Sequence, residues 1–308
     1  MTDSSRYSGA LLGLACGDAL GAALEFEGRD TFEPVSGFTG GGVWQLQPGE
    51  WTDDTSLALC LATSLVEKQG FCAHDQMQRY WRWYSEGYLS CTGNCFDIGN
   101  TTRRALSRFN LSQDPWMGDA SPALSGNGAL MRLVPVVMAT RNDIQSLWRW
   151  TIDSTRTTHA SPDCIDASLV FASLLHRVLQ GESLRSVLQS PAHPGIPHGQ
   201  SIQRILNGEY HFLHRSELGK GFYVIEALEN ALWACWHGDD LESTLLLAAN
   251  LGGDADTIAA IAGQLAGAAY GVEALPDQWL EQLAWYQELM QMADQLLQLN
   301  LSLTASAR

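Results

Sequence analysis

Asn250-Leu251-Gly252-Gly253-Asp254-Ala255-Asp256-Thr257 stands directly before a run of small and apolar residues, 258–271, that has helical spacing. Asp and Thr are common at helix starts, where capping and the helix dipole together stabilise the fold by roughly 1 kcal/mol. A cap needs only one of these side chains. Two carboxylates and a hydroxyl after a Gly-Gly turn, which lets the backbone come close to a ligand, are also the hard oxygen ligands that a divalent cation prefers.

A second acidic cluster, Thr52-Asp53-Asp54-Thr55, lies far earlier in the chain and is also followed by an apolar run with helical spacing. If the two helix starts face each other, they bring four negative charges into one pocket. Carboxylates that close together share protons or bind metal, and four charges suit about two divalent ions. Two ordinary N-caps are the alternative. The metal ligands that this pairing predicts are Thr52, Asp53, Asp54, Asp254, Asp256 and Thr257.

Apolar residues recur at helical spacing along the chain, as in Leu57, Leu61 and Leu65, whereas alternating and β-branched runs are scarce. This pattern predicts an all-α fold in a single domain over residues 5–300, with a frayed tail over 301–308. Segment 28–50, rich in Gly and Pro, is expected to form a long loop, and 189–220 to be mixed. Helices are expected near residues 6–23, 53–69, 74–86, 97–109, 127–139, 143–155, 163–180, 221–236, 240–250, 255–271 and 276–300.

Glycine recurs every four residues in the first predicted helix, at Gly9, Gly13, Gly17 and Gly21. This period places the glycines on one face of the helix. We expect that face to pack closely against another helix, because glycine allows two backbones to approach each other. Asp18 lies in the same helix and is expected to be structural.

Composition and charge exclude several classes of protein. The 308 residues carry a formal net charge of −16, so we expect no binding to a nucleic-acid backbone and no polybasic contact with a membrane. We find no signal-peptide pattern and no apolar stretch long enough to span a bilayer. The seven cysteines show neither a disulfide framework nor zinc-ligand spacing. We therefore expect a cytoplasmic monomer with reduced thiols.

The two acidic clusters belong to a set of five motifs that follow one another along the chain. The others are 13–21 leading to Glu25, the segment 126–132, which reads Gly-Asn-Gly-Ala-Leu-Met-Arg, and Thr158-His159. The ordered set resembles the ADP-ribosylglycohydrolases, a family that includes dinitrogenase reductase activating glycohydrolase and hydrolases of ADP-ribosylarginine and ADP-ribosylserine. The resemblance implies a compact orthogonal helix bundle, two Mg or Mn ions, and hydrolysis of an ADP-ribosyl bond.

The resemblance also implies roles for two acids outside the clusters. It assigns Glu25 to the metal centre or to catalysis. The residues alone do not distinguish Glu25 from Glu27, which is an equally plausible acid. The resemblance places Asp97 beside the scissile bond, as the acid/base or as the contact for a guanidinium group. The local pattern around Asp97 fits an N-cap equally well.

The turn Gly126-Asn127-Gly128 leaves backbone N–H groups free for close approach by an oxyanion, although Asn-Gly turns are common anywhere. The resemblance implies that this turn binds the diphosphate and the neighbouring ribose of the substrate. It also makes His159 a contact for ADP-ribose, whereas a lone His is more often structural.

The function that these expectations support is metal-dependent removal of ADP-ribose, with ADP-ribosylarginine on a protein as the first choice of substrate. The metals would serve as template and Lewis acid, and a carboxylate would move the proton. One alternative is a module that binds ADP-ribose without hydrolysing it, against which the intact set of ligand positions argues. Others are a hydrolase of ADP-ribosylserine or small ADP-ribosyl compounds, and a metal-dependent phosphatase or nuclease.

Overall fold

The computed structural model describes residues 1–191 and 199–306, and these residues form helices and loops. Their β pairing is limited to three isolated bridges. The α-helices are α1 (Asp3–Gly21), α2 (Asp53–Lys68), α3 (Ala73–Glu86), α4 (Asn100–Ser112), α5 (Val134–Thr140), α6 (Ile144–Arg156), α7 (Pro162–Leu179), α8 (Leu184–Gln189), α9 (Gln203–Leu206), α10 (Val224–His237), α11 (Leu241–Ala249), α12 (Ala255–Tyr270), α13 (Asp277–Gln282) and α14 (Tyr286–Ser306). Short 3₁₀ turns are η1 (Pro122–Leu124), η2 (Glu209–His211), η3 (Arg215–Glu217) and η4 (Val272–Ala274).

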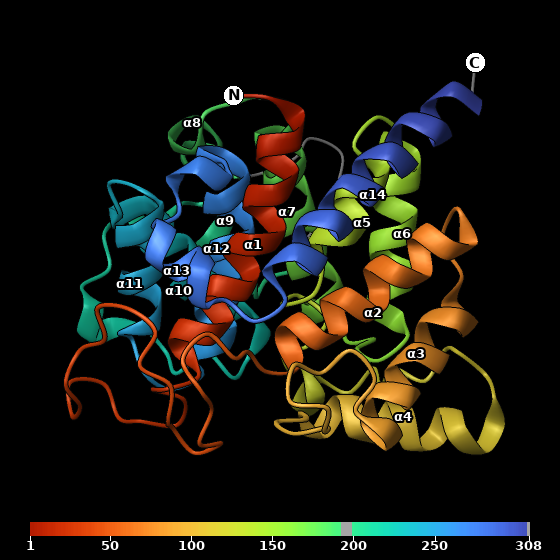
Figure 1. The fold of residues 1–308 in the computed structure, drawn as a ribbon, viewed down its shortest axis with the longest axis horizontal. Coiled ribbons are helices and arrows are strands. Elements are labelled where there is room, and N and C mark those ends of the chain that lie inside the picture. The colour runs from red at the N-terminus through yellow and green to blue at the C-terminus, as the bar shows by residue number, and fades with distance from the viewer. Residues whose placement is uncertain (192–198, 307–308) are drawn as a thin grey trace.

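Helices α1 and α12 lie side by side and antiparallel in the interior of the molecule (Figure 1). A Cβ atom on Gly13 would overlap the carbonyl oxygen of Gly263, and one on Gly17 would overlap that of Ala259. The two backbones are therefore in direct contact through the glycine face of α1, as its four-residue period predicts. Both helices are buried along most of their length.

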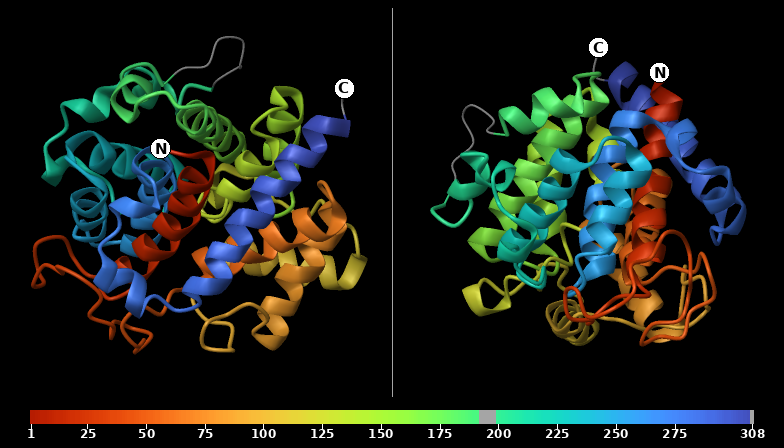
Figure 2. Two further views of the ribbon diagram at one scale, coloured as in Figure 1. Left: turned by 45° about the horizontal axis from the view of Figure 1, so that its top comes forward. Right: turned by 90° about the vertical axis from the view of Figure 1, so that its left-hand side faces the viewer.

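The other helices surround this central pair and share one apolar core with it. Helices α7, α10 and α11 pack against α12, whereas α14 packs against α1 and reaches across to α2 and α5 (Figure 2). The prediction of a single all-α domain is confirmed. In the parts of the chain that the structure describes, every helix is too short or too polar to cross a bilayer.

Most predicted helices are present, but several boundaries are wrong for local reasons. Helix α4 begins at Asn100 rather than at 97, because Asp97 has a φ of 58°, which a right-handed helix cannot contain. Helix α5 begins at Val134 rather than at 127, because 127–131 form a turn closed by Leu130 N–H on the carbonyl of Asn127. The start of α10 moves from 221 to Val224.

The last predicted helix, 276–300, is two helices. They are separated at 283–285, where Trp285 has a φ of 59° and the Ala284 N–H donates to the carbonyl of Gly49. Helix α14 then continues to Ser306, past the point where the sequence predicts the tail to begin. Helices α8 and α9 were not predicted, and the part of the mixed segment at 192–198 lies outside the described residues, as do 307–308 of the tail.

Two long loops lie at the same side of the molecule, at the lower edge of Figure 1. Residues 28–50 follow α1, and residues 87–99 join α3 to α4. The first of these was predicted from its Gly and Pro content. Both loops approach the end of the α1–α12 pair from which α2 also begins, so they are placed to cover whatever lies there.

Gly13→Ala adds one methyl group at the contact between α1 and α12, where it meets the backbone of Gly263. Backbone cannot turn aside as a side chain can, so we expect the free energy of unfolding in urea to fall by about 1–3 kcal/mol. Gly37→Ala is the matched control, because its added methyl group meets only Trp279 Nε1, at 3.4 Å. Equal stability of the two variants would contradict the close contact.

Candidate metal and substrate site

The acidic starts of α2 and α12 meet at one end of the buried helix pair. Thr257 Oγ1 donates to Asp54 Oδ1 at 3.2 Å, and Thr52 Oγ1 donates to Asp256 Oδ2 at 3.5 Å. These residues come from sequence positions roughly two hundred apart, yet each hydroxyl reaches across to the other cluster. The structure thus brings the predicted ligands of the two helix starts into one group.

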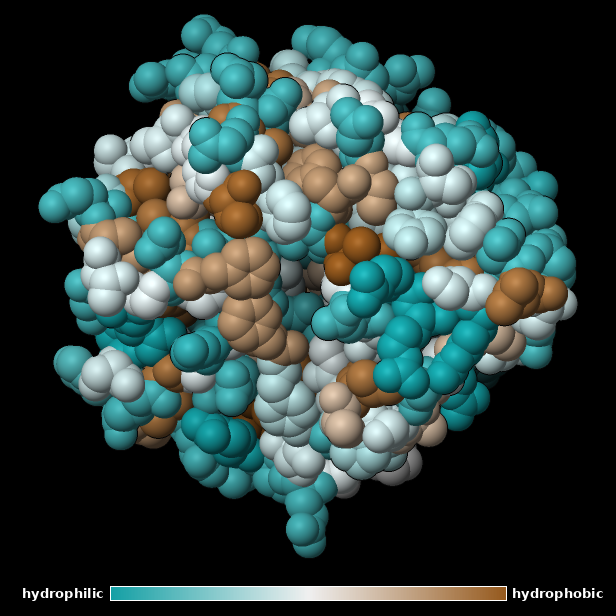
Figure 3. Space-filling model, turned by 90° about the horizontal axis from the view of Figure 1, so that it is seen from below, coloured by the Kyte–Doolittle hydropathy of each residue, from teal (hydrophilic) through white to brown (hydrophobic). Residues whose placement is uncertain are grey.

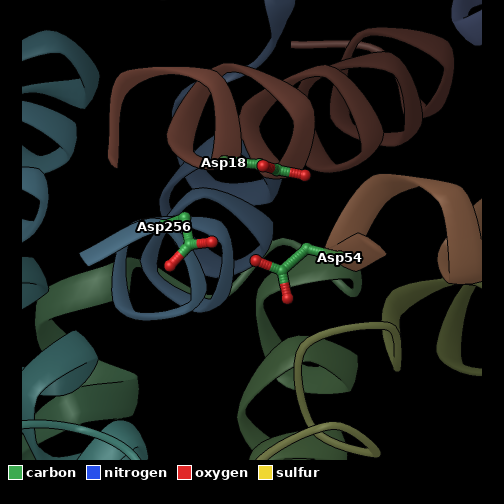
Figure 4. A group of neighbouring side chains, drawn as sticks. All are labelled: Asp18, Asp54 and Asp256. Carbon is green, nitrogen blue, oxygen red and sulfur yellow. The ribbon is translucent and has the colours of Figure 1, made fainter. Parts of the chain in front are cut away.

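Asp18 of α1 joins this group and also holds α2 in place. Its Oδ1 accepts from the Thr52 N–H at 2.8 Å, and its Oδ2 accepts from the N–H and the hydroxyl of Thr55 at 3.0 and 2.6 Å. Asp18 therefore caps the start of a helix other than its own. Figure 4 shows its carboxylate beside those of Asp54 and Asp256, which point toward each other from α2 and α12.

The alternative that the two acidic clusters are ordinary N-caps fits α2 better than α12. Thr52 is the N-cap of α2 and accepts from the Asp54 N–H at 3.5 Å. Asp254 occupies the N-cap position of α12, but its side chain makes no capping hydrogen bond. Its Oδ2 instead accepts from Asn127 Nδ2 at 2.6 Å, and the same amide group donates to the Gly221 carbonyl at 2.8 Å. Asn127 thus orients an acid of the site, a role that the sequence did not suggest.

Within residues 1–191 and 199–306, the carboxylates of the site have no cationic partner. Ion pairs among the described residues involve other acids. Asp54 Oδ2 and Asp256 Oδ1 are buried and lack any hydrogen-bond partner in the same part of the chain. Carboxylates can remain in such a place only if they are protonated or bind a cation.

Two groups of acids are close enough to hold metal ions. Asp18, Asp54 and Asp256 form one, and Glu25, Asp254 and Asp256 form the other, with one oxygen from each residue within 4.8 Å of the others in its group. Asp256 belongs to both groups. The donor set is entirely carboxylate oxygen, with hydroxyl groups nearby, and this suits hard divalent cations.

Without a cation, the surroundings favour the protonated form of these acids. Burial, followed by the charge of Asp256, raises the pKa of Glu25 to about 8. Burial raises the pKa of Asp254 to about 7, and burial together with neighbouring acids raises the pKa values of Asp53 and Asp54 well above the usual range. A bound divalent cation would stabilise the ionised forms instead.

Glu25, rather than Glu27, is the acid that reaches the site. Glu25 is buried, whereas Glu27 is exposed. Trp44 Nε1, from the loop 28–50, donates to Glu25 Oε2 at 2.6 Å. The Trp44 ring lies 5.7 Å from the ring of Phe96 in the second loop, so the two loops meet over the acid. Of the two acids that the sequence leaves open, Glu25 is the one that lies beside Asp254 and Asp256.

Asp97 follows Phe96 and lines the same cavity as Glu25 and Asp254. Burial, and then the charges of the neighbouring acids, raise its pKa strongly. The N-cap interpretation of Asp97 is wrong, because Gly99 is the N-cap of α4 and that position has no capping side chain. Asp97 has a left-handed backbone and lies in the cavity lining beside the acidic groups.

A cavity of about 600 Å³ extends from the acids toward the surface. The face that carries the loops is hollowed near its centre, with polar and apolar side chains side by side around the hollow (Figure 3). Acids line one part of the cavity, and the glycine turn with His159 lines another. Its lining includes Glu25, Asp53, Asp97, Asp254, Thr257, Thr101, Thr102, Ser125, Gly126, Asn127, Gly128, His159, Phe222 and Tyr223.

His159 is buried beside the glycine turn. A Cβ atom on Gly126 would lie 3.5 Å from His159 Nε2, and one on Gly128 would lie 3.0 Å from His159 Cε1. The two glycines therefore leave this edge of the imidazole open to the cavity. Burial, and then the charge of Arg132, lower the pKa of His159 to about 3, so the ring is neutral at physiological pH.

The sequence analysis did not anticipate three features of this site. It treated Asp18 as structural, whereas Asp18 is both the cap of α2 and part of an acidic group. It did not single out Trp44, although that residue lies in a loop expected to cover a site. It described the sequence around Arg132 without giving the side chain a role. A Trp in a glycine-rich loop, and an Arg inside an otherwise apolar run, are the signals that were available.

Comparisons with known proteins agree on one family. The model of the ADP-ribosylglycohydrolase family matches residues 1–304. The chain is 40% identical over 292 residues to a Pseudomonas putida (strain GB-1) protein named ADP-ribosylarginine hydrolase Tri1, covering 94% of this chain and 77% of that one. It is 32% identical over 283 residues to an ADP-ribosyl-dinitrogen reductase glycohydrolase of Rhodospirillum rubrum, covering 90% of each.

A solved structure, described as an ADP-ribosylglycohydrolase-related protein complex, has the same fold. It superposes with a TM-score of 0.87 at 41% identity, over 97% of this chain and 99% of that one. Sequence and fold therefore agree over nearly the whole chain. The chain belongs to the ADP-ribosylglycohydrolase family.

Proposed function

We propose that this chain removes ADP-ribose from ADP-ribosylarginine on a protein, with two divalent cations, Mg²⁺ or Mn²⁺, in the acidic cluster. As a member of its family, it hydrolyses an ADP-ribosyl glycosidic bond. The observation that carries the proposal is a set of buried carboxylates without cationic partners at one side of an open cavity. Relatives at 40% identity are named ADP-ribosylarginine hydrolases, which supports the choice of arginine.

The residues present fit a pair of cations. Asp18, Asp54 and Asp256 would contribute to one position, and Glu25, Asp254 and Asp256 to the other. Asp256 is common to both groups and so is suited to bridge two ions. The buried oxygens Asp54 Oδ2 and Asp256 Oδ1, which have no protein donor, support this role. Asp53, Thr52 and Thr257 complete the set proposed from the sequence.

When bound, two cations at this position would act as Lewis acids on the substrate ribose hydroxyls and fix the ring for cleavage at C1. The protein supplies the proton transfer. Glu25 has a pKa raised to about 8, is held by Trp44, and lines the cavity, so it is placed to exchange a proton with water or with the leaving group. A cation nearby would lower the pKa of Glu25 and favour its carboxylate form.

Asp97 is proposed to meet the leaving group. It lines the cavity next to Glu25 but lies outside both metal groups, so its carboxylate can face a substrate. An arginine side chain presents a planar guanidinium, which a carboxylate binds through charge-assisted hydrogen bonds. Cleavage releases this guanidino nitrogen, and the contact would orient it as the bond to ribose breaks.

The remaining part of the cavity would hold the ADP moiety. Gly126 and Gly128 lack side chains, which allows a diphosphate to approach the backbone there. Neutral His159 lies beside both glycines and would donate a hydrogen bond without adding charge. The Asn127 side chain lies on the other side of the turn, where its Nδ2 donates a hydrogen bond to Asp254 Oδ2. The glycine turn would thereby link the ADP-binding part of the cavity to the metal-binding part.

A comparison of three substrates tests the proposed linkage. ADP-ribosylarginine, ADP-ribosylserine and ADP-ribose 1-phosphate are offered at equal concentration with Mn²⁺, and the products are separated by chromatography. We expect the largest kcat/KM for ADP-ribosylarginine, with intact ADP-ribose as the product. A larger value for ADP-ribosylserine would overturn the choice of arginine, and release of nucleotide or free phosphate would indicate cleavage at phosphorus.

Metal binding should stabilise the fold, because cations remove the repulsion among buried acids. Mg²⁺ or Mn²⁺ at a hundred times Kd should add about 2.7 kcal/mol to the free energy of unfolding and raise Tm, and a chelator should reverse the change. Asp256→Asn, which removes a charge common to both groups, should abolish most of this rise and lower hydrolysis by orders of magnitude.

The control for that variant is Asp277→Asn, the same change in the first turn of α13, where the side chain is exposed. It should leave both the metal-induced rise and the hydrolysis unchanged. Without metal, Asp256→Asn should melt no lower than the wild type, since one of the buried charges has gone. A wild-type Tm that does not change in millimolar metal would show that the acids do not form a metal site.

Asp97→Asn should separate catalysis from binding. It keeps the size of the side chain but loses the charge that pairs with guanidinium, so hydrolysis of ADP-ribosylarginine should fall by about 10²–10⁴-fold. Affinity for ADP-ribose, measured by calorimetry with Mn²⁺, should change little. Hydrolysis of a serine-linked substrate should fall less. Wild-type hydrolysis of ADP-ribosylarginine by this variant would rule out both roles proposed for Asp97.

A further inference from the structure

Arg132 is a buried cation that has no ion-pair partner among the residues that the structure describes. Its side chain is almost inaccessible, and no carboxylate in the described part of the chain lies within ion-pair distance. The guanidinium lies over the ring of Tyr80, 4.6 Å from its centre. Burial of a charged group costs free energy unless the group is paired or hydrogen-bonded. The hydrogen bonds of Arg132 show where it acts.

The Arg132 guanidinium joins two segments that line the cavity. Nη1 donates to the carbonyl oxygen of Gly128 at 2.8 Å, and Nη2 donates to Thr158 Oγ1 at 2.6 Å. Gly128 belongs to the glycine turn, and Thr158 immediately precedes His159. One fixed planar group therefore sets the position of the turn and of the histidine together.

The Thr158 hydroxyl transmits this contact to the imidazole. Thr158 Oγ1 lies 2.8 Å from His159 Nδ1, and Thr158 is fully buried. Arginine can only donate hydrogen bonds, so the hydroxyl oxygen accepts from Arg132. The hydroxyl proton then needs an acceptor. Among the described residues, His159 Nδ1 is the one acceptor in hydrogen-bonding contact with it.

We propose that Arg132, acting through the Thr158 hydroxyl, fixes His159 as the tautomer whose proton is on Nε2, so that the ring presents an N–H donor to an acceptor oxygen of a ligand in the cavity. The opposite tautomer places a proton on Nδ1. The hydroxyl proton of Thr158 would then be buried without an acceptor, which is unfavourable. Arg132 and Thr158 are positioning residues in this arrangement.

The surroundings of the ring agree with this assignment. Nε2 has no hydrogen-bond partner in the part of the chain that the structure describes, and it lies at the edge left open by Gly126 and Gly128. The lowered pKa of His159 keeps the ring neutral, so it carries a single N–H. A neutral donor can bind an anionic oxygen without requiring a proton from solvent.

The identity of the ligand rests on the proposed function. A phosphate or ribose oxygen of ADP-ribose has the acceptor character that Nε2–H requires. The tautomer itself follows from protein contacts alone and is present before any ligand binds. The two parts of the inference can therefore be measured separately.

The tautomer is tested by nitrogen-15 NMR of the uniformly labelled full-length protein, without ligand and near neutral pH. Long-range correlations from the ring protons distinguish a protonated from an unprotonated ring nitrogen. The His159 signals are assigned by their loss in His159→Asn. We expect a protonated nitrogen at Nε2 and an unprotonated nitrogen at Nδ1. A protonated Nδ1, or a rapid mixture of both tautomers, would overturn the proposal.

Two matched variants test the role of the hydroxyl. Thr158→Val keeps the shape but removes the donor, so His159 should become a mixture of tautomers, and the affinity for ADP-ribose should fall about 10- to 100-fold. Thr158→Ser keeps the hydroxyl and should retain both the tautomer and the affinity. Mn²⁺ affinity should be the same in both variants, because Thr158 lies outside the acidic groups.

Circular dichroism establishes whether both variants fold. If Thr158→Val does not fold, Arg132→Lys takes its place: it keeps the charge but cannot make both hydrogen bonds, and it should produce the same mixture of tautomers. If a folded Thr158→Val protein kept the same His159 tautomer and the same affinity for ADP-ribose, the role proposed for the Thr158 hydroxyl would be overturned. A wild-type protein that shows the expected tautomer but does not bind ADP-ribose would count against the proposed function, and the tautomer assignment would stand.

Discussion

The site depends on the backbone contact between α1 and α12. Glycines on α1 let the two helices approach until side chains no longer fit between them. This closeness sets Asp18 beside Asp256, and Asp18 in turn holds the start of α2 through Thr52 and Thr55. A wider separation of the two helices would move the cap of α2 away from the start of α12. The packing of small residues thus determines the geometry of the acids.

Burial of these acids close together costs free energy that protein contacts alone do not offset. Several carboxylates are buried together, and two of their oxygens receive no hydrogen bond from the described residues. The N–H groups and dipoles at the starts of α2 and α12 favour negative charge, but this effect amounts to about 1 kcal/mol per helix end. Burial of unpaired charges costs more than that. The apo protein is therefore expected to carry extra protons, and its stability is linked to cation binding.

Local patterns predicted the parts of the fold that depend on neighbours in sequence. The glycine period of α1, the acidic starts of α2 and α12 and most helices follow from spacing of three or four residues. Contacts between distant residues were not predictable in this way. Trp44 reaches Glu25 from a loop without periodicity, and Asp97 lines the cavity from a residue with a left-handed backbone. Asn127 was assigned to substrate, whereas its amide hydrogens are used on Asp254 and on a carbonyl.

A chain with a net charge of −16 that binds an anionic substrate must keep its positive potential local. The buried guanidinium of Arg132 lies near the glycine turn without an acid to neutralise it, and the proposed cations would occupy the other part of the cavity. Neither source of charge is exposed at the surface. A small anion that enters the cavity is attracted from both sides. Enclosed positive charge would allow an acidic protein to bind a diphosphate in its cavity without a basic surface.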